Sequence, residues 1–136
     1  MDSIDGFAKG SQPELYRNFT GVTYTHGVRD LAEEKGAYWL IDAIGSHVVA
    51  NPDFRQQCRK DERFERMQIW ILKENGGNVQ LIAVSDTGEE EKNPPILQEV
   101  GYSDFDFDES GECKLYCAAN WDGEKTIYTI LKPSEY

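Results

Sequence analysis

The apolar run that decides the fold is Gly36-Ala37-Tyr38-Trp39-Leu40-Ile41-Asp42-Ala43-Ile44-Gly45-Ser46-His47-Val48-Val49, residues 36–49. Its apolar residues recur at the spacing of one helix face, at Ala37, Leu40, Ile41, Ile44 and Val48. The other apolar side chains of the run widen this face, so only a small part of the helix surface is polar. A helix of this kind is normally buried, so we expect a core helix on which a sheet packs. The run is too short, and too often interrupted by polar residues, to cross a bilayer.

Shorter helical segments are predicted before this run. Residues 1–12 are expected to be a flexible arm, because they show no periodicity. Residues 13–19 are typical of one or two helical turns, with a proline at the first helical position. Thr25 offers an N-cap for a short helix, which we expect to end or bend at Gly36.

The segment 53–66 is highly charged and is expected to form a surface helix or loop, because Asn51-Pro52 ends the apolar run. On a helix its arginines would share one face, at Arg55, Arg59, Arg63 and Arg66. We interpret this basic cluster as a solvated surface with ion pairs.

From Met67 onward the pattern is that of strands. Residues 67–72 and 79–84 flank Asn75-Gly76-Gly77-Asn78, a strong hairpin signal. Three further strands are predicted at 96–102, 112–119 and 126–131. The expected fold class is therefore α+β, with N-terminal helices packed on a mainly antiparallel sheet of four or five strands. A single domain would span residues 13–136.

The cysteines and the first residues both favour a cytoplasmic protein. Three cysteines, an odd number, argue against a disulfide framework. Cys113 and Cys117 would lie roughly 13 Å apart on one strand, too far for a disulfide. The first six residues are acidic where a secretory signal would be basic and then apolar.

The acidic charge is concentrated in one stretch. Residues 86–124 hold twelve acidic and two basic residues, which accounts for −10 of the formal net charge of −11. This charge disfavours direct contact with nucleic acid and favours a protein partner with a basic surface. The residues predicted to form the acidic partner-binding surface are Glu89, Glu90, Glu91, Asp104, Asp106, Asp108 and Glu109.

Metal and catalytic signals are weak. The Asp-x-Asp-x-Asp run at 104–108 begins like a calcium loop, but Glu109 and Leu115 stand where that loop needs glycine and glutamate. Two histidines cannot supply a zinc site. No nucleophile, phosphate-loop or dinucleotide motif is present. We therefore predict no cofactor and no metal, and we lean against an enzyme.

Asp42 is the one carboxylate inside the apolar run, and a buried carboxylate needs partners. Arg29 or His26 could supply them in a structural network. In a functional interpretation, Asp42 would act as a base with His26 or His47 as its acid partner. Three tryptophans, Trp39, Trp70 and Trp121, could stack bases only beside a basic groove; without one they belong in the core or at an interface.

The segment from Tyr24 to Ile44, Tyr-Thr-His-Gly-Val-Arg-Asp-Leu-Ala-Glu-Glu-Lys-Gly-Ala-Tyr-Trp-Leu-Ile-Asp-Ala-Ile, resembles the hallmark of a family of small bacterial, plasmid-borne and phage proteins with a domain of unknown function. Gln68-Ile69-Trp70 and Pro133-Ser134-Glu135-Tyr136 extend the resemblance over roughly residues 13–136. The resemblance implies a role in conflict between mobile elements and their hosts.

Two functions follow as expectations. The first is a non-enzymatic acidic binding protein, a phage or mobile-element inhibitor that occupies the basic surface of a CRISPR-type or other nucleic-acid-targeting defence complex. The alternative is a small enzyme or metabolite-binding protein with a pocket between the core helix and the sheet. The candidate pocket residues are Tyr38, Asp42, His47 and Trp70. The oligomeric state stays open.

Overall fold

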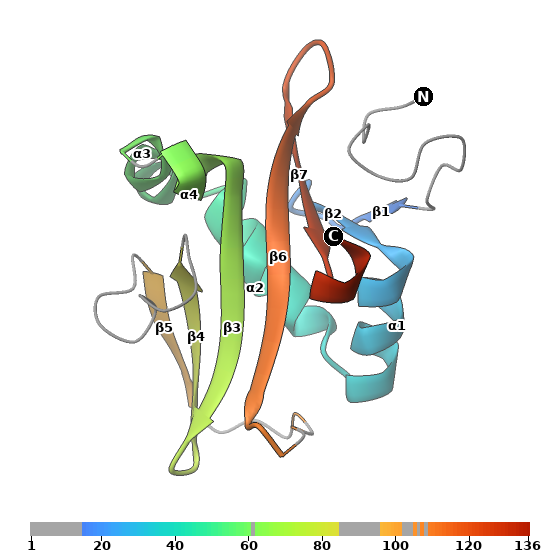
Figure 1. The fold of residues 1–136 in the computed structure, drawn as a ribbon, viewed down its shortest axis with the longest axis vertical. Helices are drawn as coiled ribbons and strands as arrows, with labels where there is room; N and C mark the ends of the chain where they lie inside the picture. The colour runs from blue at the N-terminus through green and yellow to red at the C-terminus, as the bar shows by residue number, and fades with distance from the viewer. Residues whose placement is uncertain (1–14, 61, 85–95, 102–104, 106, 108) are drawn as a thin grey trace.

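A seven-stranded mixed sheet dominates the computed structural model, which describes residues 15–60, 62–84, 96–101, 105, 107 and 109–136 (Figure 1). The strand order is β1-β2-β7-β6-β3-β4-β5. The strands are β1 (Leu15–Arg17), β2 (Thr23–Thr25), β3 (Met67–Asn75), β4 (Asn78–Val84), β5 (Ile96–Gly101), β6 (Glu112–Trp121) and β7 (Thr126–Leu131). The helices are α1 (His26–Lys35), α2 (Tyr38–Val48), α3 (Pro52–Arg59), α4 (Glu62–Arg66) and the 3-10 helix η1 (Pro133–Glu135).

The predicted fold class was wrong. The sheet has seven strands rather than four or five, one parallel pairing between β2 and β7 makes it mixed, and it dominates over the four short α-helices of the described residues. The segment expected to be helical at 13–19 contains strand β1, which pairs antiparallel with β2. Strand β2 in turn pairs parallel with β7, the last strand of the chain. Pairing between distant segments overrides a weak local helical pattern.

The predicted helix after Thr25 is confirmed in α1. The Thr25 hydroxyl caps its first turn by accepting from the Val28 amide at 3.3 Å. Gly36 ends it in the left-handed conformation at φ 61°. The five strands predicted from residue 67 onward are also present, and β3 and β4 form the expected hairpin.

The predicted core helix is confirmed in α2, which crosses one face of the sheet behind β3 and β6 (Figure 1). It buries Leu40, Ile41, Ile44, Gly45 and Val48. Gly45 has no space for a side chain, because Thr20 and Val22 of the loop between β1 and β2 press against its backbone. This contact fixes the β1–β2 loop against the core helix.

The main core lies between α2 and the facing side of the sheet. Sheet residues at alternate positions supply it, including Trp70, Leu72, Leu81, Leu115, Cys117 and Ile130. A smaller cluster on the opposite face contains Ile69, Ile71, Ile82 and Val84. The main core fixes the sheet relative to the helices that surround the site described below.

Helices α3 and α4 are anchored by two phenylalanines. Phe54 packs edge-on against Phe64, with ring centroids 5.5 Å apart, and at a tilt against Trp70, with ring centroids 5.7 Å apart. The amide of Phe54 also donates to the Asn51 side chain, which caps α3. No helix in the described part of the chain combines the length and apolar character that a membrane crossing requires.

Candidate functional site

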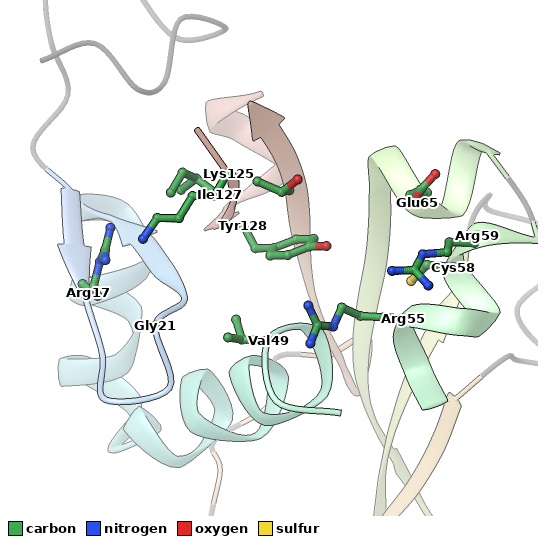
Figure 2. A pocket seen from close by; sticks show the side chains of 11 residues that line it. Arg17, Gly21, Val49, Arg55, Cys58, Arg59, Glu65, Lys125, Ile127 and Tyr128 are labelled. Atoms are coloured by element: carbon green, nitrogen blue, oxygen red, sulfur yellow. The ribbon is translucent and has the colours of Figure 1, made fainter. Parts of the chain in front are cut away.

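A pocket of about 420 Å³ opens where four separate parts of the chain meet (Figure 2). The loop between β1 and β2, the end of α2, the helices α3 and α4, and the start of β7 all contribute to it. Its lining residues are Arg17, Gly21, Val49, Arg55, Cys58, Arg59, Glu65, Lys125, Thr126, Ile127 and Tyr128. We call it the basic pocket.

The pocket is positively charged in a strongly acidic protein. Four of its lining residues are cationic, at Arg17, Arg55, Arg59 and Lys125, whereas Glu65 is the single carboxylate among them. The chain as a whole has a formal net charge of −11. A concave site lined by one sign of charge raises the local concentration of counter-ions. The electrostatics of this pocket therefore favour an anionic ligand.

Local structure explains the direction of the two α3 arginines. Phe54 and Cys58 lie four residues apart and are buried, so they fix the rotation of the helix. Arg55 and Arg59 each follow one of these anchors and are exposed. Figure 2 shows both guanidinium groups extending from α3 toward the Tyr128 side chain.

The side chains of the four cations are not engaged in hydrogen bonds or ion pairs with other described residues, although Lys125 lies in the field of the Asp122 carboxylate. No hydrogen bond or ion pair joins the side chain of Arg17, Arg55, Arg59 or Lys125 to another described group. Arginines in folded proteins are usually held by carboxylates or carbonyls when they cluster, because like charges repel. The pocket thus presents unused donors to whatever enters it.

Two titratable groups in the pocket stay neutral at ordinary pH. Burial, and then the negative field of Glu65, raises the pKa of the Cys58 thiol to about 11, although Arg59 opposes this shift. Burial also raises the pKa of Tyr128, and Arg55 opposes it. Cys58 is therefore a thiol rather than a thiolate nucleophile, and the Tyr128 hydroxyl is available as a hydrogen-bond donor.

The four predicted pocket residues lie elsewhere. Trp70 is buried and stacks on His47 at 5.6 Å, and His47 Nε2 lies 2.8 Å from the side-chain oxygen of Gln98. Asp42 accepts a hydrogen bond from the Asn18 amide at 2.9 Å. Tyr38 donates to the Glu33 carboxylate at 2.7 Å. The structure thus brings together His47 and Trp70, and none of the four residues lines the basic pocket.

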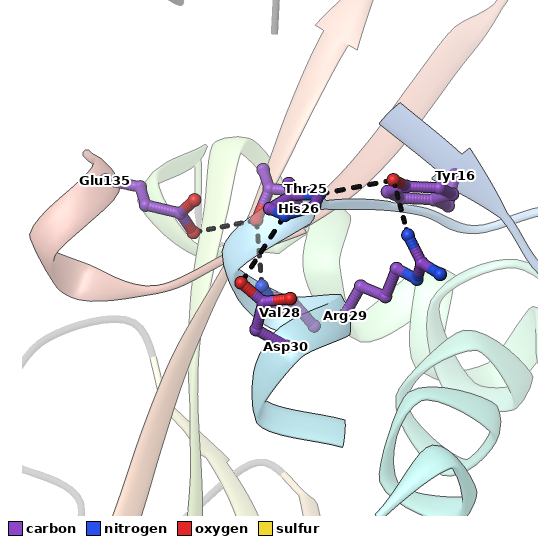
Figure 3. A network of polar contacts seen from close by, with 7 residues as sticks. All are labelled: Tyr16, Thr25, His26, Val28, Arg29, Asp30 and Glu135. Atoms are coloured by element: carbon purple, nitrogen blue, oxygen red, sulfur yellow. Dashed lines mark hydrogen bonds and ion pairs between the residues drawn. The ribbon is translucent and has the colours of Figure 1, made fainter. Parts of the chain in front are cut away.

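The polar residues around α1 form a second cluster, which we call the α1 clamp (Figure 3). It comprises Tyr16, Thr25, His26, Arg29, Asp30 and Glu135. Tyr16 accepts a hydrogen bond from Arg29 at 2.9 Å, and its hydroxyl lies 3.2 Å from His26 Nδ1. His26 Nε2 lies 3.5 Å from the Asp30 carboxylate. These contacts occupy His26 and Arg29, which the sequence had suggested as partners of Asp42.

Glu135 completes the α1 clamp from the end of the chain. Its carboxylate accepts from the Thr25 hydroxyl at 2.7 Å and from the Lys132 amide at 2.8 Å. Thr25 is the residue that caps α1. The hydrogen bonds with Tyr16 and then Tyr38 raise the pKa of Arg29. Because its members bond to one another, we interpret the α1 clamp as structural.

The predicted acidic surface lies largely outside the described residues. Glu109 is described and exposed, whereas the other six members (Glu89, Glu90, Glu91, Asp104, Asp106 and Asp108) fall outside. The aspartates of the calcium-like run are among those six. Within the described residues, no three histidine, cysteine or carboxylate side chains converge on a position that could hold a metal ion.

The sequence indicated part of the basic pocket, its two α3 arginines, but did not indicate that they line a pocket. The spacing of Arg55 and Arg59 indicated a shared helix face, which we interpreted as solvated. Arg17 and Lys125 come from opposite ends of the chain and belong to no local pattern. The β2–β7 parallel pairing, which brings these ends together, has no signature in the sequence.

Comparison with known proteins identifies a family but no characterised relative. No curated protein and no solved structure shows significant similarity to the chain. A family model described as "Family of unknown function (DUF6876)" matches residues 7–136, which is nearly the whole sequence. The chain therefore belongs to this family of unknown function.

Proposed function

We propose that this protein binds a small anionic ligand of the phosphate type in the basic pocket, and that it acts by binding rather than by catalysis. One observation carries the proposal: four cations whose side chains make no hydrogen bond or ion pair with another described residue line a single pocket of about 420 Å³. Pockets for small ligands commonly have volumes of about 300–1,000 Å³. This volume and this charge suit a compact polyanion.

The chemistry of the lining supports a phosphate-type ligand. Arginine presents a planar fork of donors that matches phosphate oxygens, and such charged hydrogen bonds each contribute about 1.5–3 kcal/mol. The neutral Tyr128 hydroxyl adds a donor without adding charge. The one thiol in the lining, Cys58, is held in its protonated, unreactive form. These features supply binding groups and no activated reactive group.

Pyrophosphate is the simplest probe of this proposal. We expect calorimetric titration to show binding that weakens at high salt, because exposed charges are screened. Arg55→Gln should lower the affinity about tenfold, which corresponds to one lost charged hydrogen bond. Arg66→Gln is the matched control, since it removes the same charge from α4 outside the pocket lining.

Two results would overturn the proposal. One is the absence of any heat of binding or thermal stabilisation with pyrophosphate at low salt, because a ligand of the folded state must raise the melting temperature. The other is an equal loss of affinity in Arg55→Gln and Arg66→Gln. Equal losses would mean that the ligand senses only the net charge of the protein.

The acidic stretch supports a second candidate function. Residues 86–124 carry most of the net charge, and their described members Glu99, Glu109, Asp122 and Glu124 are exposed. We propose this surface as a docking site for a basic protein, in line with the role in conflict between mobile elements and their hosts that the resemblance implies. Charge reversal at Glu109 and Asp122 should abolish salt-sensitive capture of such a partner; capture that is unaffected contradicts this function.

A further inference from the structure

Trp121 lies beside the basic pocket with its ring in solvent. Its side chain is 66% exposed, and it ends strand β6 at the hairpin with β7. In the ladder it is paired with Thr126, which lines the pocket. Paired residues of an antiparallel ladder point to the same face of the sheet. The Trp121 ring therefore stands on the face of the sheet that carries the pocket.

The exposure of Trp121 has a structural origin. Leu115 and Cys117, on the same side of β6, are buried in the main core. Farther along β6, the β6–β7 hairpin runs past the helices into solvent (Figure 1). Trp121 is at this uncovered end. Among the described residues no aromatic ring packs against Trp121, so its exposed ring is open to a stacking partner from outside the chain.

The pocket cations form two groups that frame this end of the sheet. Arg55 and Arg59 extend from α3 on one side, and Arg17 and Lys125 point toward each other on the other side (Figure 2). Lys125 is the immediate neighbour of Thr126, the partner of Trp121. A phosphate held by these cations would thus have an aromatic platform next to it.

From this juxtaposition we infer that the ligand of the basic pocket is a nucleoside phosphate, whose phosphates bind the four cations and whose base stacks on Trp121. The inference rests on the proposed anion-binding function and adds the ligand class to it. A phosphate group together with a flat aromatic ring is the chemistry that cationic and aromatic side chains recognise jointly in nucleotides.

A single nucleotide fits better than a long strand. The basic charge is confined to one pocket, whereas the rest of the chain is acidic and repels a polyanion that extends beyond the pocket. The pocket volume of about 420 Å³ also suits a small ligand. We therefore assign the site to free nucleoside diphosphates or monophosphates.

ADP and pyrophosphate form a matched pair of probes, because both carry the diphosphate and only ADP carries a base. We expect ADP to bind about tenfold more tightly than pyrophosphate, the typical gain from stacking one base. Trp121→Ala should remove this gain and leave pyrophosphate affinity unchanged. Trp121→Phe should restore much of it, because a phenyl ring still stacks. Tyr136→Ala is the control, since Tyr136 is also exposed but lies outside the pocket lining.

The outcomes separate this inference from the function on which it rests. If ADP and pyrophosphate bind with equal affinity, and Trp121→Ala changes neither affinity, the assignment of the ligand as a nucleotide is wrong. The proposed anion-binding function would then still stand. Binding of neither probe overturns both. A single-stranded oligonucleotide that binds more tightly than ADP overturns the assignment to free nucleotides. Circular dichroism of each variant confirms that the exposed substitutions leave the fold unchanged.

Discussion

Two polar clusters of this protein contain arginines, and they use them in opposite ways. In the α1 clamp, Arg29 donates to the Tyr16 hydroxyl at 2.9 Å and lies 4.9 Å from the centre of the Tyr16 ring. In the basic pocket, Arg55 and Arg59 have no hydrogen-bond or ion-pair partner among the described side chains. The members of one cluster bond to one another, whereas the arginines of the other make no side-chain bond within the described residues.

This difference separates a cluster that stabilises the fold from a cluster that we propose to bind a ligand. Bonds within the α1 clamp connect strand β1, helix α1 and the last helical turn of the chain, so they stabilise the fold. Clustered cations without partners repel one another and contribute no stability. Features that local physics does not favour tend to occur at functional sites. Substitutions in the α1 clamp should therefore mainly affect stability, and substitutions in the basic pocket should mainly affect binding.

The largest expected effect is at the two carboxylates, one in each cluster. Glu135→Ala leaves the buried Thr25 hydroxyl without its acceptor, so the free energy of unfolding should fall by about 2–3 kcal/mol. Glu65→Ala should leave stability nearly unchanged and should tighten pyrophosphate binding a few-fold, because it removes the one carboxylate lining the pocket. Urea denaturation measures the free energy of unfolding of both variants, and calorimetric titration measures their affinity for pyrophosphate. Similar stability losses in the two variants would contradict the assignment of the α1 clamp to folding and of the basic pocket to binding.

A smaller effect is expected at Gly27, in the first turn of α1. A Cβ atom there would lie 2.5 Å from a carboxylate oxygen of Glu135. Because Thr25 and Lys132 hold that carboxylate, Gly27→Ala should cost about 1–2 kcal/mol. In the Glu135→Ala background the same change should be neutral or stabilising, since alanine favours helix. Additive effects in this double-mutant cycle would show that Glu135 is not held in place.

The confirmed parts of the fold are those with strong local signals. Thr25 and Gly36 mark the start and the end of α1, and the turn at residues 75–78 connects the two strands of the first hairpin. Strands β1 and β2 are three residues each, too short for a hydrophobic period to show. Their places in the sheet come from the parallel pairing of β2 with β7, a contact across most of the chain. The sequence therefore could not show a mixed sheet of seven strands.

The site was harder to predict than the fold for the same reason. Arg17 and Lys125 meet only because β2 and β7 are neighbours. The net charge also misled, since a chain of net charge −11 offers no sign of a cationic pocket. One conditional expectation does bear on the site: a tryptophan could stack bases only beside a basic groove. Trp121 is exposed and pairs with Thr126 of the pocket lining, whereas Trp70 is buried in the core.

Cys58, beneath the basic pocket, gives an effect that depends on pH. Its pKa is about 11 in the folded protein, against an ordinary value of 9.0. A group whose folded pKa is raised contributes stability below its unfolded pKa and loses it as pH rises, here between about pH 9 and 11. By pH 10 the loss should be about 1 kcal/mol. Wild type should therefore lose more stability than Cys58→Ala over this range; parallel curves would contradict the raised pKa.

The smallest expected effect separates the two arginines themselves. Arg29→Gln removes the donor to Tyr16 and the cation over its ring, so it should lower the melting temperature. Arg55→Gln removes no bond within the described chain and should leave the free energy of unfolding within about 0.5 kcal/mol of wild type. Binding should show the reverse order, with pyrophosphate affinity retained in Arg29→Gln and lost in Arg55→Gln. An arginine that matters for both properties would place both clusters in one site, and the division between folding and binding would fail.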